Sequence, residues 1–271
     1  MENYSVLMSV YYKEQAENLR EAIDSILNQT VKTNEFIIVK DGPLTEKLDN
    51  TIKEYVEEYP GVFKIITLEK NMGLAKALNK GIEQCSNEII ARMDSDDISM
   101  PDRMERQLEA MEANRADILS GTIVEFDESV DKPTAKRELP EKNEQIIEFA
   151  KKRSPFNHPA VMFKKSDVIK AGSYMDFHGF EDYYLWLRML SGGMKGYNLS
   201  EVLVYMRVGN GMYARRGGVS YLKDMAEFRK IMLNSGYINL LEFLTSVITR
   251  GIVILMPANL RKTVYSVFLR K

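Results

Sequence analysis

Three aspartates crowd the segment Asp94–Asp97 (Asp-Ser-Asp-Asp), directly after an apolar run that ends at Met93. Like charges this close repel one another, which costs stability unless a cation joins them. A hard divalent cation with oxygen ligands is the natural partner, and it could bridge a diphosphate. The alternative is a solvated acidic turn that caps the next helix. A calcium-binding EF-hand loop is excluded, because Ile98 and Ser99 occupy positions that need a ligand and a glycine.

Two other acidic positions stand where a carboxylate could meet a substrate. Asp41 follows the apolar run 35–40 and precedes Gly42, so it would lie at a strand tip and could hydrogen-bond a base or a ribose. The alternative is a plain turn residue. Glu181 and Asp182 precede a bulky apolar stretch, where a carboxylate could serve as a general base. The alternative is a helix N-terminus that carries acidic residues for its dipole.

Two glycine-containing segments could hold phosphate groups. The segment from Asn71 through Gly73 to Lys76 opens a helix, so its backbone N–H groups and the lysine could face a phosphate. Arg215 and Arg216 lie in a stretch with four glycines, and this loop could close over a diphosphate. The alternatives are a loop before an amphipathic helix and a solvated surface loop.

The remaining reactive side chains are few. The two histidines, His158 and His178, are too isolated for a histidine-based metal site, although both could line the cleft near Glu181. The single cysteine, Cys85, is interpreted as a buried filler, in keeping with a reducing compartment.

The bulk composition is that of a globular protein, with 45% hydrophobic and 28% charged residues. A net charge of -2 gives no strong field toward nucleic acid. No basic region precedes the first apolar run, so no signal peptide is expected. The longest apolar stretch, residues 240–256, is interrupted by Glu242 and Arg250 and is short for a bilayer span.

The elements that must position these residues alternate between strand and helix patterns. Strands are predicted at 5–10, 35–40, 63–68, 88–93 and 118–126, with helices between them, one of which runs from Pro101 to Asn114. Near-continuous apolar strands separated by helices predict a parallel sheet covered on both faces. Ligands bind such sheets beyond the carboxyl ends of the strands, where Asp41 and Asp94–Asp97 fall.

The second half of the chain reads less regularly. Residues 127–143 are polar and predict a loop or insertion, followed by a helix that ends near Lys152. Further elements are a strand at 160–163, a helix at 183–190, an alternating strand at 202–208, and helices from Ser220 onward.

Taken together, these segments resemble the family 2 glycosyltransferases, which are inverting enzymes of GT-A fold. The resemblance runs from Tyr4 to Val208 and lies in the order and spacing of several modest motifs. They are Ser5–Tyr11, Ala22–Thr30, Glu35–Gly42, Asn71–Asn79, Ala91–Asp97 with Pro101–Arg103, Asn157–Ala160 and Glu181–Arg188. The resemblance implies an α/β GT-A (Rossmann-like), mostly parallel sheet flanked by helices, with a helical C-terminal extension.

The resemblance also implies residue roles. Ser9, Tyr11 and Asp41 match positions that hold the nucleotide base, usually uracil, while Asp94 and Ser95 match the ribose and diphosphate neighbourhood. Asp96 matches the metal-binding aspartate, with Asp94 beside it, and the cofactor would be manganese or magnesium. Asp182 matches the general base, and Glu181, Trp186 and His158 would lie on the acceptor side. Two departures, Ser9 for a frequent proline and Lys40 for a frequent acidic residue, leave the choice of base open.

The C-terminal part resembles a subgroup of bacterial capsule, exopolysaccharide and amylovoran-type enzymes, on the segments 207–211, 213–218 and 256–261. This implies a polyprenyl-diphosphate-linked acceptor at the cytoplasmic face of the plasma membrane. Residues 237–271 carry five basic residues and one acidic residue, which suits an interfacial anchor. The alternative is a set of helices packed on the catalytic domain.

The expected organisation is a catalytic domain over 1–208, with nucleotide-sugar binding in 1–126 and acceptor binding in 127–208, then a loop and helices over 209–271. The expected reaction is a single in-line displacement. Two rivals remain. A nucleotidyltransferase would need a glycine-rich basic loop after the first strand, where Tyr11–Glu14 has no glycine. A non-catalytic nucleotide-sugar-binding scaffold would not need Asp96 and Asp182.

Overall fold

The computed structural model describes residues 2–177, 179–209 and 218–256, so His178, Arg215 and Arg216 lie outside the described residues. The first half contains β1 (Tyr4–Val10), α1 (Ala16–Leu27), β2 (Glu35–Lys40), α2 (Glu46–Glu58), β3 (Phe63–Thr67), α3 (Leu74–Gln84), β4 (Ile89–Asp94), β5 (Ile98–Ser99), α4 (Arg103–Asn114) and β6 (Ile118–Phe126). The second half contains β7 (Pro133–Arg137), α5 (Asn143–Ala150), the 3-10 turn η1 (His158–Ala160), β8 (Met162–Lys164), α6 (Lys165–Lys170), α7 (Glu181–Ser191), β9 (Gly196–Arg207), α9 (Gly218–Asn234) and α10 (Leu240–Leu255).

One sheet runs through the molecule in the order β3-β2-β1-β4-β8-β6-β9-β5, and β7 pairs with β6. Strands β3, β2, β1 and β4 are parallel, as the alternation of strands and helices predicts. The short β8 is antiparallel to both β4 and β6, and the long β9 returns parallel to β6. The predicted α/β fold with a mostly parallel sheet is confirmed.

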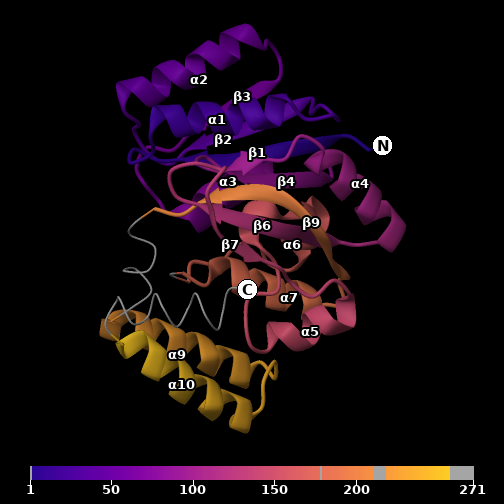
Figure 1. The fold of residues 1–271 in the computed structure, drawn as a ribbon, viewed down its shortest axis with the longest axis vertical. Helices are drawn as coiled ribbons and strands as arrows, with labels where there is room; N and C mark the ends of the chain where they lie inside the picture. The colour runs from indigo at the N-terminus through magenta and orange to yellow at the C-terminus, as the bar shows by residue number, and fades with distance from the viewer. Residues whose placement is uncertain (1, 178, 210–217, 257–271) are drawn as a thin grey trace.

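Side-chain alternation along the strands builds a core on each face of this sheet. One core packs residues such as Val6 and Met8 of β1 against helices α1, α2 and α4. The other packs Leu7 of β1 and Ile90 of β4 against helices α3, α7 and α9. Figure 1 shows these helices on both sides of the strands. Cys85 is buried in the second core, as predicted, and burial raises the pKa of its thiol to about 12.

Parts of the second half differ from the prediction. The polar stretch 127–143 is not an unstructured insertion, because it contains β7, which pairs antiparallel with β6. Strand β9 begins at Gly196, earlier than the alternating pattern at 202–208 indicates. The short β5 pairs with β9 and has too few residues to show a period. Helix α4 begins at Arg103, two residues after Pro101.

The C-terminal helices lie at the end of the molecule opposite α2 (Figure 1). Phe228 of α9 stacks on Phe180 just before α7, with ring centroids 4.7 Å apart and planes at 17°. The guanidinium of Arg229 donates to the carbonyl oxygens of Lys151 and Lys152 at the end of α5. Helix α9 therefore shares a core with α7, and α10 packs on α9. None of the helices in the described residues is long and apolar enough to cross a membrane.

Candidate active site

The carboxyl ends of β1, β2 and β4 bring three polar residues to one edge of the sheet. Ser9 on β1 pairs in register with Asp94 on β4. The next residue, Val10, is opposite Lys40, which is the last residue of β2. Asp41 directly follows Lys40. Since the strands are parallel, the residues expected from sequence to meet a nucleotide converge on this edge.

The segment after β4 is held by side chains from outside the acidic motif. Arg92, two residues earlier on β4, grips both carboxylate oxygens of Asp94 with its two terminal nitrogens. The Ser95 hydroxyl donates to Glu14 Oε2 at 3.0 Å, which ties the segment to the turn after β1. From β9, the Arg207 backbone N–H donates to Asp97 Oδ1 at 2.8 Å.

The resulting carboxylate group carries more negative charge than its surroundings compensate. Burial, followed by the charges of Asp94 and Glu14, raises the pKa of Asp96 to about 7. Burial together with Asp94 and Asp96 raises the pKa of Asp97 well above its usual range. Asp97 Oδ2 is buried and has no hydrogen-bond partner in the described residues. A divalent cation at this edge would relieve the repulsion.

Two buried polar side chains, Arg103 and Gln29, hydrogen-bond to the backbone on either side of the acidic segment. Arg103 of α4 donates to the carbonyl oxygen of Arg92 at 2.8 Å and to Gln107 Oε1 at 2.8 Å. Burial and the Arg92 charge lower the pKa of Arg103 to about 9. Gln29 donates to the Met100 carbonyl at 2.7 Å and accepts from the Met104 N–H at 3.0 Å, so it fixes the start of α4.

Asp41 binds a loop of its own chain. Its two carboxylate oxygens accept the backbone N–H groups of Met72 at 2.7 Å and Gly73 at 3.1 Å. The Asn71 amide donates to the Asp41 carbonyl at 3.3 Å. The prediction that the N–H groups of this loop face a phosphate therefore fails for Met72 and Gly73, because Asp41 already takes both. Lys76 is the third residue of α3, and its Nζ lies 3.4 Å from Asp176 Oδ2 at the exposed surface.

Two of the predicted acceptor-side residues, His158 and Trp186, contact Tyr174. Glu181 and Asp182 lie in the first turn of α7. Burial raises the pKa of the Tyr174 hydroxyl, the charge of Arg92 opposes this shift, and the charges of Asp182 and Glu181 add to it. The ring nitrogen Nε2 of His158 lies 2.9 Å from that hydroxyl. Burial, followed by Arg92, holds the pKa of His158 well below its usual range, so the imidazole is neutral at physiological pH.

Trp186 does not lie where the sequence places it. The side chain has no exposed surface, so in this structure its ring cannot contact an acceptor. The ring packs edge-on against His158 and Tyr174, with centroids 5.9 and 6.0 Å away, and Phe156 and Phe163 also surround it. Trp186 therefore supports the residues that border the site, because α7 turns this face into the core.

Sequence reasoning missed four residues of this arrangement, namely Glu14, Arg92, Tyr174 and Arg207. Arg92 carries a signal that could have found it, since residues two apart on a strand point to the same face, here that of Asp94. Tyr174 and Arg207 reach the site only through the tertiary fold. Tyr11 follows β1 directly, with 39% of its surface exposed.

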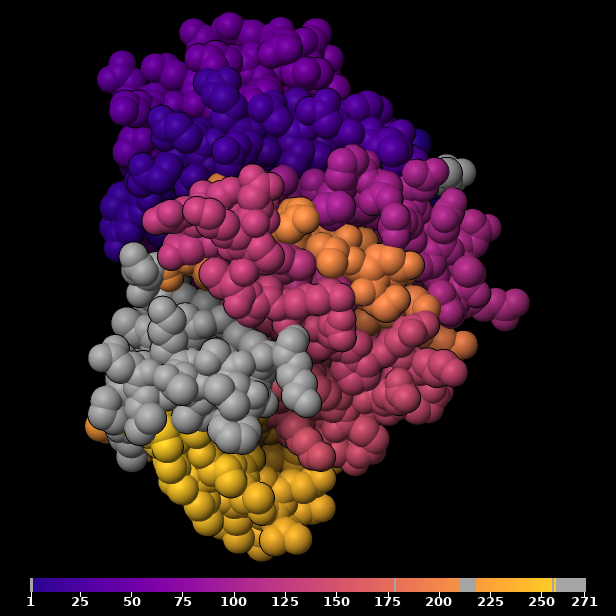
Figure 2. All heavy atoms as spheres, viewed as in Figure 1, coloured from indigo at the N-terminus to yellow at the C-terminus, as the bar shows by residue number. Residues whose placement is uncertain are grey.

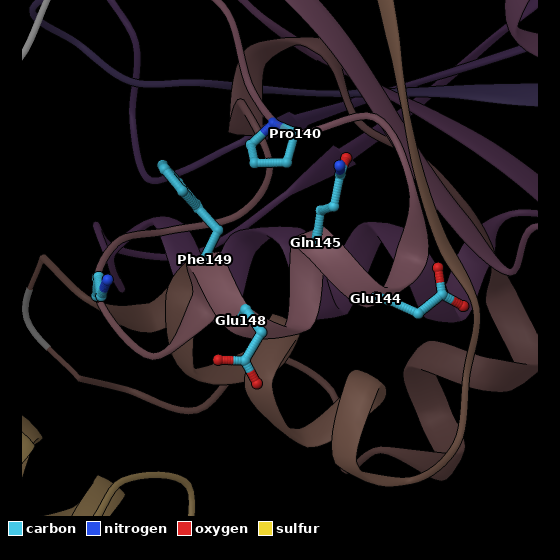
Figure 3. Close-up of a pocket in the computed structure, with 6 residues that line it drawn as sticks. Pro140, Glu144, Gln145, Glu148 and Phe149 are labelled. Atoms are coloured by element: carbon cyan, nitrogen blue, oxygen red, sulfur yellow. The ribbon is translucent and has the colours of Figure 1, made fainter.

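A depression lies along α5 (Figure 3). Its lining residues are Pro140, Glu144, Gln145, Glu148, Phe149 and Lys152. None of them belongs to the carboxyl edge of the sheet, and the two glutamates would repel a diphosphate. The candidate site is therefore the strand edge and not this depression.

Comparison with known proteins shows the family of this chain. The glycosyl transferase family 2 profile matches residues 5–173. The chain is 41% identical to the amylovoran biosynthesis glycosyltransferase AmsE of Erwinia amylovora over 97% of both chains. It is 38% identical to a UDP-Gal:alpha-D-GlcNAc-diphosphoundecaprenol beta-1,3-galactosyltransferase of Escherichia coli, covering 99% of this chain and 97% of that one. The chain belongs to glycosyl transferase family 2, and it is a glycosyltransferase.

A solved glycosyltransferase structure shares the fold of this chain. The mannosyltransferase PcManGT of Pyrobaculum calidifontis, solved with GDP-Man and Mn2+, superimposes with a TM-score of 0.66. The match covers 100% of this chain and 81% of that one at 15% sequence identity. This likeness establishes the GT-A-type fold, and the family membership rests on the sequence matches.

Proposed function

We propose that this glycosyltransferase moves a sugar from a UDP-sugar to a hydroxyl of a glycan carried on a polyprenyl diphosphate, with inversion of the anomeric carbon. The reaction would belong to bacterial cell-surface polysaccharide biosynthesis, a context that the names of both relatives support. One observation carries the proposal. The acidic segment Asp94–Asp97 begins at the end of the parallel strand β4, where Asp94 pairs in register with Ser9 at the end of β1.

The donor side would use the carboxyl edge of the sheet. Ser9, Tyr11 and Asp41 would border the nucleotide base, while Asp94 and Ser95 would border the ribose and diphosphate. Asp41 also holds the loop that carries Asn71 and Gly73 in place. Lys76, Arg215 and Arg216 would supply positive charge toward the diphosphate, and the two arginines lie outside the described residues.

The acidic segment fits a divalent metal ion. The described residues contain no group of three or more His, Cys, Asp or Glu side chains that could hold a metal by themselves. Mn2+ and Mg2+ at phosphate-transfer sites are usually held by one or two carboxylates together with substrate phosphates, so Asp96, with or without Asp94, is adequate. Burial, followed by the charges of Asp94 and Glu14, raises the pKa of Asp96, and a bound cation would offset these charges. The metal, when bound, supplies positive charge that stabilises the departing diphosphate.

The acceptor side would use Asp182 as the general base. Asp182 takes the proton of the acceptor hydroxyl while that oxygen forms its bond to the anomeric carbon. The bond from the anomeric carbon to the diphosphate oxygen breaks in the same step, so the configuration inverts. One carboxylate is enough, because the diphosphate leaves as an anion and needs no proton. Glu181 and the neutral His158 would border the acceptor.

Helix α10 would bring the enzyme to the inner face of the plasma membrane. Its outer face carries an apolar stripe with exposed fractions from 47% to 74%. From Leu241 on, its members are three to four residues apart, and the stripe consists of Leu240, Leu241, Leu244, Ile248 and Ile252. The hydroxyl groups of Thr245 and Thr249 on this face donate to carbonyl oxygens of the helix itself. The only basic side chain of α10, Arg250, donates instead to the Lys152 carbonyl. Figure 2 shows α10 at the end of the molecule.

The test is a transfer assay with UDP-sugars and a short-chain polyprenyl diphosphate that carries N-acetylglucosamine. We expect one UDP-sugar to give a disaccharide product whose new linkage, measured by NMR, has the opposite anomeric configuration to the donor. A product that retains the configuration would refute inversion. No transfer from any nucleotide sugar to lipid-linked or free glycans would refute the proposed reaction.

A further inference from the structure

Arg92 lies where the pattern of β4 calls for an apolar side chain. It follows Ile90 by two residues and precedes Asp94 by two, so all three side chains point to the face packed by α3 and α7. Its side chain is only 2% exposed. A buried guanidinium is costly unless it is paired, so its retention here needs an explanation.

The pairing of Arg92 is specific in its geometry. Its two terminal nitrogens take one carboxylate oxygen of Asp94 each, in a forked arrangement. Its Nε has no partner in the described residues. The Asp94 side chain is 31% exposed, so the face of this carboxylate that Arg92 does not cover is open to the site. Arg207 Nε donates to the backbone carbonyl of Asp96 at 3.1 Å, and no cation among the described residues forms an ion pair with the Asp96 carboxylate.

We propose that Arg92 is a positioning residue that gives Asp94 and Asp96 different roles, and this inference rests on the proposed function. The fork orients Asp94 and compensates its charge, so that Asp94 is reserved for hydroxyl groups of the donor. Asp96 then supplies the protein carboxylate for the metal. On this account Asp94 need not ligate the metal, because Arg92 already compensates its charge.

Two physical consequences follow from removing the guanidinium. Asp94 becomes free to turn toward the metal with its full charge, and a positive charge close to the metal position disappears. Both changes strengthen the binding of a divalent cation alone. The same change leaves Asp94 without a fixed orientation toward the donor, so the nucleotide sugar binds less well.

The experiment compares wild type, Arg92→Met and Arg92→Lys, with Arg229→Met as a control for the loss of a buried arginine far from the site. Mn2+ binding without nucleotide is measured by electron paramagnetic resonance, and UDP binding at saturating Mn2+ by calorimetry. We expect Arg92→Met to bind Mn2+ alone about tenfold more tightly and to weaken UDP-sugar binding, raising KM more than it lowers kcat. Arg229→Met should lose stability without a change in Mn2+ affinity.

Arg92→Lys keeps the charge but cannot form the fork. We expect its Mn2+ affinity to stay near that of wild type, while its KM for the donor rises. If Arg92→Met does not fold, Arg92→Lys still tests the positioning role. A donor KM that stays at the wild-type value in Arg92→Lys contradicts that role. If wild type binds Mn2+ and UDP but Arg92→Met binds Mn2+ no more tightly, only the role of Arg92 is wrong. If wild type binds neither, the proposed function fails with it.

Discussion

The side-chain amide of Asn79 clasps the backbone of Tyr174 from both sides. Its Nδ2 donates to the Tyr174 carbonyl at 2.7 Å, and its Oδ1 accepts the Tyr174 N–H at 2.9 Å. Asn79 lies on α3, the helix that follows the donor loop, and the hydroxyl of Tyr174 meets His158 on the acceptor side. One side chain thus connects the two halves of the candidate site.

Replacing Asn79 should loosen this connection. Asn79→Ala leaves the partly buried N–H and carbonyl of Tyr174 without partners, which costs about 1–3 kcal/mol of the free energy of unfolding. Urea denaturation measures this loss. The matched control is Asn114→Ala, which removes one amide bond to a helix carbonyl near the surface and should cost less than about 0.5 kcal/mol. Equal losses in the two variants would contradict the clasp.

Gly42 should not tolerate a side chain. Its φ is +88°, and a Cβ at this position would lie 2.5 Å from the backbone nitrogen of Asn71. Gly42→Ala should therefore destabilise the fold by more than about 1 kcal/mol and displace the loop that Asp41 holds, which weakens UDP binding. Gly61 is the matched control, because its φ of +86° is nearly the same but its Cβ would meet open space. Calorimetric UDP binding should be normal in Gly61→Ala and weakened in Gly42→Ala.

The metal-free protein should lose stability as the pH rises. The pKa of Asp96 is about 7 in the folded state, above its value in the unfolded chain, so the folded state binds more protons between roughly pH 4 and 7. The contribution of Asp96 to stability is therefore fully present below the unfolded pKa and disappears as the pH passes through 7. Melting temperatures across this range should show the decline, and Asp96→Asn should flatten it. The affinity for Mn2+ should rise with pH over the same interval, because the cation competes with the proton.

The apolar stripe of α10 should bind lipid surfaces. Leu244→Asp and Ile248→Asp together place two charges on a face already exposed to solvent, so the fold should be unaffected. Sedimentation with vesicles of anionic phospholipid should show the wild type in the pellet and the double variant in the supernatant. Ile169→Asp on α6, where the side chain is 51% exposed, is the control and should still sediment. If the double variant sediments as the wild type does, the stripe is not the membrane contact.

Sequence alone predicted the elements that carry the donor edge. Strands β1, β2 and β4 are nearly continuous apolar runs, because buried parallel strands have hydrophobic neighbours on both faces, and β2 was placed without error at Glu35–Lys40. The polar residues at their ends follow directly from this. Strand β7 escaped notice since it lies mostly exposed at the sheet edge and begins with Pro133, so it has no buried face to leave a pattern.

The side-chain contacts that hold the acidic segment and the acceptor side could not be predicted from the apolar pattern of the strands. Trp186 stands in the acceptor-side motif, yet the direction in which α7 presents it depends on packing against Phe156 and Phe163. Glu14 meets Ser95 across 81 positions of sequence, and such a contact exists only after the sheet has formed. Arg92 was the exception, because alternation along β4 already places it beside Asp94.

The most direct test of the central claim is thermal unfolding of the purified protein with UDP, with and without Mn2+, in wild type, Asp96→Ala and Asp182→Asn. UDP at ~100 times its dissociation constant adds about 2.7 kcal/mol, which raises the melting temperature of a chain this size by several degrees. We predict a Mn2+-dependent rise in wild type, its loss in Asp96→Ala, and its preservation in Asp182→Asn, which transfers no sugar. A melting temperature that no nucleoside diphosphate raises, with or without metal, would contradict the assignment of the donor site to the carboxyl edge of this sheet.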